Sequence, residues 1–182
     1  MKIPKELFQD QELLLRNVRP NDCKGNYRRW MNDPETTRFL ESRFRPWNTD
    51  DLIAYLTEMN SNPDILFLAI VKTDSGQHIG NIKLWSINPK HKFTEIGLII
   101  DKRYWGKGYG ASALRLLSDY AFSTLRLHKV WAGCYEPNIG AIKAFKKAGF
   151  VEEGRFKSQY LLDGKYVDDI ILGKVNDQRT KV

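Results

Sequence analysis

The sequence has no apolar run close to the roughly 20 residues that a membrane-spanning helix needs. Its first residues, MKIPKELFQDQ, are polar throughout, which argues against a signal peptide. It contains only 2 cysteines, Cys23 and Cys134, whose spacing suggests neither a metal site nor a redox pair. These absences predict a soluble cytoplasmic protein that has reduced thiols and makes no membrane contact.

Histidine is also scarce, with 3 residues, and none stands at a metal-ligand spacing from a cysteine or a carboxylate. His78 and His91 flank turns and are expected to be exposed, whereas His128 lies where a helix meets a strand. We therefore predict no metal site. No linker, internal repeat or low-complexity tract interrupts the chain, which predicts a single domain over residues 1–182.

The charge is unbalanced, with a formal net charge of +7 and an isoelectric point near 9.4. This balance suits an anionic ligand, an acidic protein or a nucleic acid, and charge alone does not separate the three. The basic residues are scattered along the chain rather than gathered in one block. No recognition helix or aromatic stacking motif is present, which argues against nucleic acid as the partner.

The apolar periodicity predicts an α/β fold with a mixed, mostly antiparallel sheet of about seven strands and about four helices. Strands are expected over residues 13–18, 66–71, 79–85, 94–100, 129–135, 157–162 and 165–172, and helices over about 20–31, 48–59, 110–125 and 139–148. The strand 94–100 is nearly continuous in apolar residues at its end, which is typical of a strand buried on both faces. One parallel crossover is expected in the middle of the sheet.

The segment RYWGKGYGASALRLL carries three glycines between an apolar strand and an amphipathic helix. Glycine lets successive backbone N–H groups converge on an anion. The start of the following helix adds unpaired amides and a partial positive charge, and Lys107 adds a full one. The segment therefore predicts a cradle for a pyrophosphate.

Several interpretations compete for this glycine segment. A Walker-type loop fails, because Lys107 is followed by Gly108 rather than by Ser or Thr. Gly106, Gly108 and Ala111 satisfy the dinucleotide fingerprint, but no acidic residue follows at about 20 residues and no second βαβ unit exists. A glycine turn without a ligand is the remaining structural alternative.

The stretch EIGLIIDKRYWGKGYGASAL, followed by NIGAIKAFKKAGF, resembles the GNAT N-acetyltransferase family, and specifically its RimJ/RimL-type subgroup. The resemblance covers roughly residues 13–175 and is strongest over residues 95–150. The wider family has Gln or Arg where this chain opens the glycine loop with Trp105, as its subgroup often does.

The resemblance implies that acetyl-CoA is a co-substrate bound across a splayed pair of central parallel strands. The end of strand 94–100 would pair with the pantetheine arm, the loop amides would hold the pyrophosphate, an asparagine would reach the arm, and a phenylalanine would pack near the thioester. The implied cofactor-binding residues are Leu98, Ile99, Ile100, Trp105, Gly106, Lys107, Gly108, Tyr109, Gly110, Ala111, Ser112, Asn138 and Phe145.

Acetyl transfer to an amine needs a proton acceptor, a donor to the oxyanion and a proton for the thiolate. A backbone amide near the end of strand 94–100 could stabilise the oxyanion, an effect of roughly 3–4 kcal/mol in comparable sites. Glu95 is the expected base, with a surface or ion-paired carboxylate as the alternative. The positions where relatives carry a Tyr or Ser acid hold Phe145 and Ala141 here, so Tyr160 or a water is the candidate acid.

The acceptor is expected to meet residues 28–47, which in this family form one wall of the acceptor cleft. This segment carries carboxylates that suit a cationic amine and the arginines Arg38, Arg43 and Arg45 that suit a phosphate. The sequence predicts acetyl transfer to a primary amine, either a protein N-terminus or a small amine such as a nucleotide-linked amino sugar. A non-catalytic acyl-CoA-binding or basic interaction module is the alternative, and both a monomer and a homodimer stay open.

Overall fold

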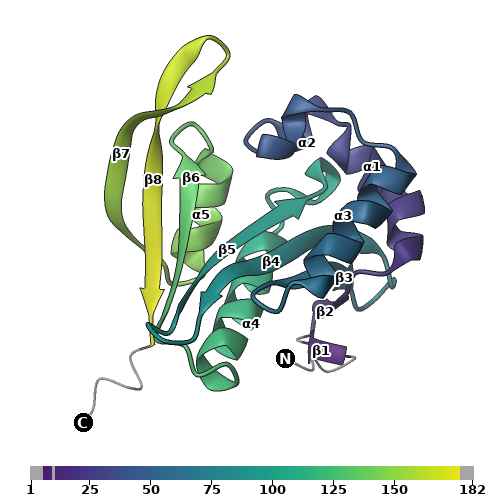
Figure 1. Ribbon diagram of the computed structural model, residues 1–182, viewed down its shortest axis with the longest axis horizontal. Coiled ribbons are helices and arrows are strands. Elements are labelled where there is room, and N and C mark those ends of the chain that lie inside the picture. Colours follow the sequence, from purple (N-terminus) through teal and green to yellow (C-terminus); the bar gives the residue numbers. More distant parts are fainter. Residues whose placement is uncertain (1–5, 10, 177–182) are drawn as a thin grey trace.

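A computed structural model of the protein describes residues 6–9 and 11–176. These residues form one eight-stranded sheet of order β1-β2-β3-β4-β5-β6-β8-β7, with helices on both faces (Figure 1). The strands are β1 (Glu6–Gln9), β2 (Leu13–Asn17), β3 (Leu66–Lys72), β4 (His78–Asn88), β5 (Phe93–Ile100), β6 (Lys129–Tyr135), β7 (Val151–Leu162) and β8 (Lys165–Val175). The α-helices are α1 (Asn26–Met31), α2 (Pro34–Thr37), α3 (Thr49–Ser61), α4 (Tyr109–Ser123) and α5 (Ile139–Lys147). Short 3₁₀ turns cover Pro20–Lys24, Glu41–Phe44 and Lys102–Tyr104.

The expected mixed, mostly antiparallel sheet with one parallel pair is confirmed, and β1 is an additional strand. The helix expected over residues 20–31 is divided into a 3₁₀ turn and α1, because Gly25 leaves helical geometry (φ −113°, ψ −127°). The Asp163-Gly164 turn between β7 and β8 has positive φ at both residues, as a tight hairpin turn requires.

The alternating side chains of β3 supply two hydrophobic cores, one on each face of the sheet. Leu66, Leu68 and Ile70 pack in the cluster that contains the buried residues of α4. Phe67, Ala69 and Val71 pack in the cluster that contains buried residues of α1 and α3. Because β3 is buried on both faces, it anchors β4 and, through β4, β5 in the sheet.

The only parallel pair among the described strands, β5 and β6, is hydrogen-bonded at its beginning alone. Three residues of β5, Phe93–Glu95, pair with Lys129–Trp131 of β6. Beyond them β5 stays paired with β4 and β6 stays paired with β8, so that the two strands diverge (Figure 1). The divergence leaves one edge of β5 without a strand partner from Ile96 onward.

The divergence also corrects the expectation that strand 94–100 is buried on both faces. Thr94 and Ile96 are buried, but residues 97–100 are only half-buried. Their apolar side chains lie where β6 has already moved away. The apolar end of β5 therefore lines a cleft rather than the middle of a closed sheet.

The side chain of His78 is only 10% exposed, not exposed as expected from its place beside a turn. Its Nε2 lies 2.8 Å from Asn81 Oδ1, and its ring lies edge-on to Trp30 at 4.8 Å between centroids. Burial lowers the pKa of His78, although the nearby Asp22 carboxylate favours the charged form. The contacts place His78 in the packing of α1 against the sheet.

Among residues 6–9 and 11–176, no helix has the length and apolar character needed to cross a membrane.

Asp101 ties α1 to the end of β5. Its carboxylate is buried and accepts hydrogen bonds from the Trp30 indole at 2.8 Å, from Arg29 at 2.8 Å and from Arg103 at 2.6 Å. These bonds come from two parts of the chain about 70 residues apart in sequence. Asp101 therefore fixes the point at which the chain leaves β5 and enters the glycine segment.

We predict that Asp101→Ala lowers the free energy of unfolding by about 2–3 kcal/mol, because it leaves the buried Trp30 N–H without an acceptor. The control is Asp119→Ala, which removes an exposed carboxylate lying 3.6 Å from Lys174 and should cost under about 0.5 kcal/mol. Denaturant unfolding of both variants checks the difference. An equal loss in the two variants would contradict the role given to Asp101.

Candidate functional site

A cleft of about 580 Å³ lies where β5 and β6 diverge. Four segments line it: the end of β5, the glycine segment with the start of α4, the start and inner face of α5, and the region of α2. The lining residues are Glu35, Thr36, Phe39, Leu40, Leu98, Ile99, Ile100, Tyr104, Trp105, Gly106, Gly108, Tyr109, Gly110, Ala111, Pro137, Asn138, Ile139, Gly140, Ala141, Lys143, Ala144 and Lys147.

The glycine segment turns the chain so that α4 begins at the cleft. Gly106 (φ +74°) and Gly108 (φ +88°) both adopt the left-handed conformation that side chains disfavour. Gly108 is the N-cap of α4, so the amides of Tyr109, Gly110 and Ala111 have no carbonyl one turn earlier to bond. These three donors lie in residues that line the cleft.

Fewer backbone amides are free to bind an anion than the predicted cradle of Trp105 to Ser112 implies. The Trp105 amide donates to the Lys102 carbonyl at 3.2 Å, and the Ser112 amide donates to the Gly108 carbonyl at 3.1 Å. Trp105 instead donates its indole N–H to the Ile100 carbonyl at 2.7 Å, which holds the loop against the end of β5. The amides that can face an anion are therefore those of residues 106–111.

Most of the predicted cofactor-binding residues line the cleft, and three do not. Lys107 and Ser112 are absent from the lining. Phe145 is only 2% exposed and lies edge-on to Phe150 in the core, with ring centroids 5.0 Å apart. Asn138 lines the cleft and also caps α5, because its side-chain oxygen accepts the Ala141 amide at 3.2 Å. Its side-chain NH₂ is the group left to meet a ligand carbonyl.

Two lysines that sequence reasoning missed contribute the positive charge of the cleft. Lys143 and Lys147 are four residues apart, which places both on one face of α5. A Cβ added at Gly108 would lie 3.9 Å from Lys147 Nζ, so this ammonium lies beside the start of α4. Lys107, in contrast, extends over the Tyr104 ring at 5.3 Å. The helical spacing of the lysines was the available signal, but it does not tell which face meets the cleft.

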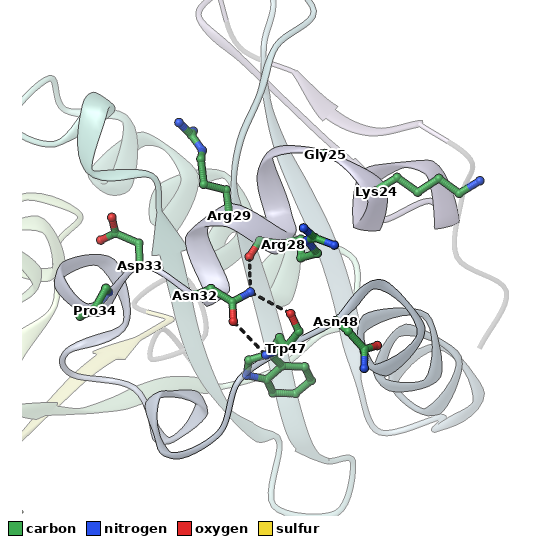
Figure 2. A pocket seen from close by; sticks show the side chains of 9 residues that line it. All are labelled: Lys24, Gly25, Arg28, Arg29, Asn32, Asp33, Pro34, Trp47 and Asn48. Atoms are coloured by element: carbon green, nitrogen blue, oxygen red, sulfur yellow. Dashed lines mark hydrogen bonds between the residues drawn. The ribbon is translucent and has the colours of Figure 1, made fainter.

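The wall formed by α2 is anchored at its two ends. Asn32 accepts the Trp47 amide at 2.9 Å and donates to the Trp47 carbonyl at 2.8 Å, as Figure 2 shows. These bonds hold residues 32 and 47 together, so that residues 33–46 form a closed loop. Glu35 and Phe39 on this loop line the cleft. The loop thus forms one wall of this cleft.

Figure 2 also shows a separate open hollow around α1, lined by basic residues that include Lys24, Arg28 and Arg29. None of its lining residues lines the cleft.

The other side of the strand divergence carries a second group of side chains, which we call the acceptor face: Glu95, Gly133, Tyr135, Tyr160 and Asp169. Glu95 pairs with Trp131, which places Glu95, Gly133 and Tyr135 on one face of the sheet by alternation. The rings of Tyr135 and Tyr160 stack at 4.1 Å with 10° between their planes. Phe39 lies 6.0 Å from the Tyr135 ring and links this face to the cleft.

Both residues predicted to be catalytic belong to the acceptor face. Burial raises the pKa of Glu95, and the Asp169 carboxylate raises it further, whereas Lys83 and Trp85 lower it. Burial, with the neighbouring Asp169, Tyr135, Glu41 and Glu95, raises the pKa of Tyr160 to about 12. Tyr160 is therefore protonated at neutral pH, and Glu95 is a stronger base than an exposed glutamate.

The three arginines expected to meet a phosphate are all engaged within the protein. Arg38 pairs with Asp163 at 2.8 Å. Arg43 donates to the Tyr135 hydroxyl at 3.1 Å, while Tyr135 donates to Glu41 at 2.7 Å. Arg45 lies over the Trp47 ring at 3.8 Å. A phosphate would have to displace these contacts.

Within the part of the chain that the structure describes, no three His, Cys, Asp or Glu side chains form a group that could hold a metal ion.

Comparisons with known proteins agree with this architecture. Residues 12–151 match the family model described as "Acetyltransferase (GNAT) domain". A spermidine N(1)-acetyltransferase of Vibrio cholerae is 33% identical over 90 residues, which are 50% of this chain and 52% of that protein. The chain thus spans about half the length of this relative. An uncharacterized N-acetyltransferase of Bacillus licheniformis, p20, is 25% identical over 90% of this chain and 92% of its own.

Among solved structures, spermidine N-acetyltransferase from Vibrio cholerae in complex with CoA and spermine has a TM-score of 0.81 at 23% identity. The alignment covers 91% of this chain and 96% of that chain. At this identity the likeness shows a shared fold.

We predict that Lys147→Ala weakens the binding of CoA about three- to tenfold, because it removes an ammonium beside the anion-binding amides. Lys146→Ala is the matched control, since the neighbouring lysine pairs with Glu152 at 3.4 Å and does not line the cleft. Isothermal titration with CoA at two salt concentrations measures both. Equal losses in the two variants would show that Lys147 acts only through the overall charge.

Proposed function

The chain belongs to the GNAT acetyltransferase family, and from that premise we propose that it is an acetyl-CoA-dependent N-acetyltransferase acting on the primary amine of a small cationic molecule. The observation that carries this proposal is the strand divergence after Glu95, which joins the anion-binding cleft to an acidic, aromatic acceptor face.

The residues of the cleft fit coenzyme A as the donor. The amides of residues 106–111 and the ammonium of Lys147 suit its pyrophosphate. The unpaired edge of β5 suits the amide groups of the pantetheine arm, which would add to the sheet as a strand does. Asn138 would donate to a carbonyl of that arm.

Acetyl-CoA supplies an activated acetyl group, and the chain supplies orientation and proton transfer. We assign to Glu95 the removal of the proton from the acceptor ammonium, directly or through a water. A backbone N–H near the end of β5 would donate to the carbonyl oxygen as negative charge develops on it. Tyr160, protonated at neutral pH, would return a proton to the leaving thiolate.

The local charges favour a polyamine-type acceptor over a phosphorylated one. Glu95 and Asp169 lie on the acceptor face without a basic partner in an ion pair among the described residues, whereas Arg38 pairs with Asp163 and Arg43 with Glu41. The half-buried Tyr160 ring, stacked on Tyr135, offers its other face to a cationic alkyl amine. The names of the spermidine acetyltransferases among the relatives agree with this class of acceptor.

The RimJ/RimL-type subgroup, which would favour a protein N-terminus, is the second candidate and rests on the loop sequence WGKGYG. Under either acceptor we propose a single catalytic domain over residues 1–182 that acts in the cytoplasm, as a monomer or a homodimer.

The test is a thiol-release assay with acetyl-CoA and a panel of amines: spermidine, spermine, a nucleotide-linked amino sugar and a peptide with a free N-terminus. We expect the highest kcat/KM with a polyamine, and an activity that rises with pH as Glu95 ionises. Glu95→Gln should lower kcat by roughly 100-fold or more and leave CoA affinity within about twofold. CoA binding without thiol release for any amine would support the non-catalytic alternative.

A further inference from the structure

Asp169 is a buried carboxylate that no sequence motif marks. It is 4% exposed, and it pairs with Tyr135 across β6 and β8. Its Oδ1 atom has no hydrogen-bond partner among the described residues. A buried carboxylate oxygen without a hydrogen bond lowers the stability of the folded protein, so its presence needs an explanation.

The backbone beside Asp169 is shaped to admit its carboxylate. A Cβ added at Gly133 would lie 2.7 Å from Asp169 Oδ2 and 2.9 Å from Oδ1, closer than real Cβ atoms approach. Only glycine at this position leaves room for the carboxylate to lie on the β6 strand. Gly133 and Asp169 thus form one structural unit at the divergence of the strands.

The surroundings of Asp169 connect it to both candidate catalytic residues. Burial raises the pKa of Asp169, whereas the Cys134 amide and the Tyr160 hydroxyl stabilise its ionised form. Its negative charge raises the pKa of Glu95 and the pKa of Tyr160, because it disfavours a second negative charge nearby. Asp169 therefore lies within electrostatic reach of both the expected base and the expected acid.

We propose that Asp169 is a positioning residue of the acetyl-transfer site: it anchors the Tyr160 hydroxyl and places a second, buried negative charge behind Glu95, the residue that meets the incoming ammonium. A buried negative charge on the same face of the sheet as Glu95 favours proton uptake by Glu95 and strengthens the attraction of the site for a cation. The inference rests on the proposed function, because it assigns Asp169 to the same reaction.

Other charged groups around Glu95 have to be considered. Lys83 faces it from β4 and opposes the effect of Asp169. Tyr160 of β7 interacts electrostatically with Glu95, and it stacks on Tyr135 of β6, which donates to Glu41. Among these groups Asp169 is the one whose charge raises the proton affinity of Glu95 most directly.

The proposal is tested with Asp169→Asn, which keeps the size of the side chain and removes its charge. Carbon-13 resonances of labelled glutamate carboxyls, with Glu95 assigned through Glu95→Gln, give the titration of Glu95 without any need for activity. We expect Asp169→Asn to move this titration to lower pH. The same variant should move the acid limb of kcat/KM to lower pH, lower kcat roughly tenfold and leave CoA affinity unchanged.

The matched control is Asp168→Asn on the same strand. Asp168 accepts the Ser158 amide at 2.8 Å and pairs with Arg155 and Lys157, and the substitution keeps an oxygen for that amide. It should leave the Glu95 titration and the pH profile unchanged. If Asp169→Asn does not fold, Gly133→Ala is used instead, because it displaces the Asp169 carboxylate without changing its charge. This variant should move the Glu95 titration and the acid limb of kcat/KM to lower pH.

An unchanged Glu95 titration in Asp169→Asn or Gly133→Ala would overturn the proposal, even if kcat falls. Absence of thiol release by the wild-type protein with every amine would instead overturn the proposed function, while the titration would still show whether Asp169 acts on Glu95.

Discussion

The arrangement of the site depends on the divergence of β5 and β6. Each strand stays hydrogen-bonded to its outer neighbour, but the two pair with each other over only three residues. Hydrogen bonds to β4 hold β5 to its last residue, and hydrogen bonds to β8 hold β6 along its whole length. A sheet with a closed centre would have satisfied the inner edge of β5 with protein alone. The divergence instead leaves backbone donors and acceptors that an extended ligand can satisfy, and it places the start of α4 at the same opening.

The local charges on the two sides of the strand divergence do not both follow the net charge of the molecule. The chain carries a net charge of +7, and the cleft follows this sign through Lys143 and Lys147. The acceptor face has the opposite character, with the half-buried carboxylate of Glu95, the buried carboxylate of Asp169 and the stacked rings of Tyr135 and Tyr160. An anionic donor and a cationic acceptor would thus be attracted to opposite sides of the same strand divergence. This separation explains why net charge alone did not identify the ligand.

The parts of the fold that follow local rules could be predicted from the sequence. The strands other than β1, the Asp163-Gly164 hairpin and the glycine segment each have a short signal, and the structure contains them near the expected residues, although β7 begins at Val151 rather than at residue 157. Contacts between distant segments had no such signal. Phe145 lies in the core instead of beside the cleft, because the orientation of α5 decides which face of the helix is buried. Lys147 and Asp169 were missed for the same reason: their roles arise from α5 meeting α4 and from β8 meeting β6.

The central claim is that a coenzyme A derivative binds in the cleft between β5 and β6, on the amides of the glycine segment. Hydrogen–deuterium exchange with and without acetyl-CoA tests it residue by residue. The account predicts slower exchange at the amides of residues 106–111 and along residues 96–100, with no change around Lys24, Arg28 and Arg29. Unchanged exchange at residues 106–111, or protection confined to the basic hollow around α1, would contradict it.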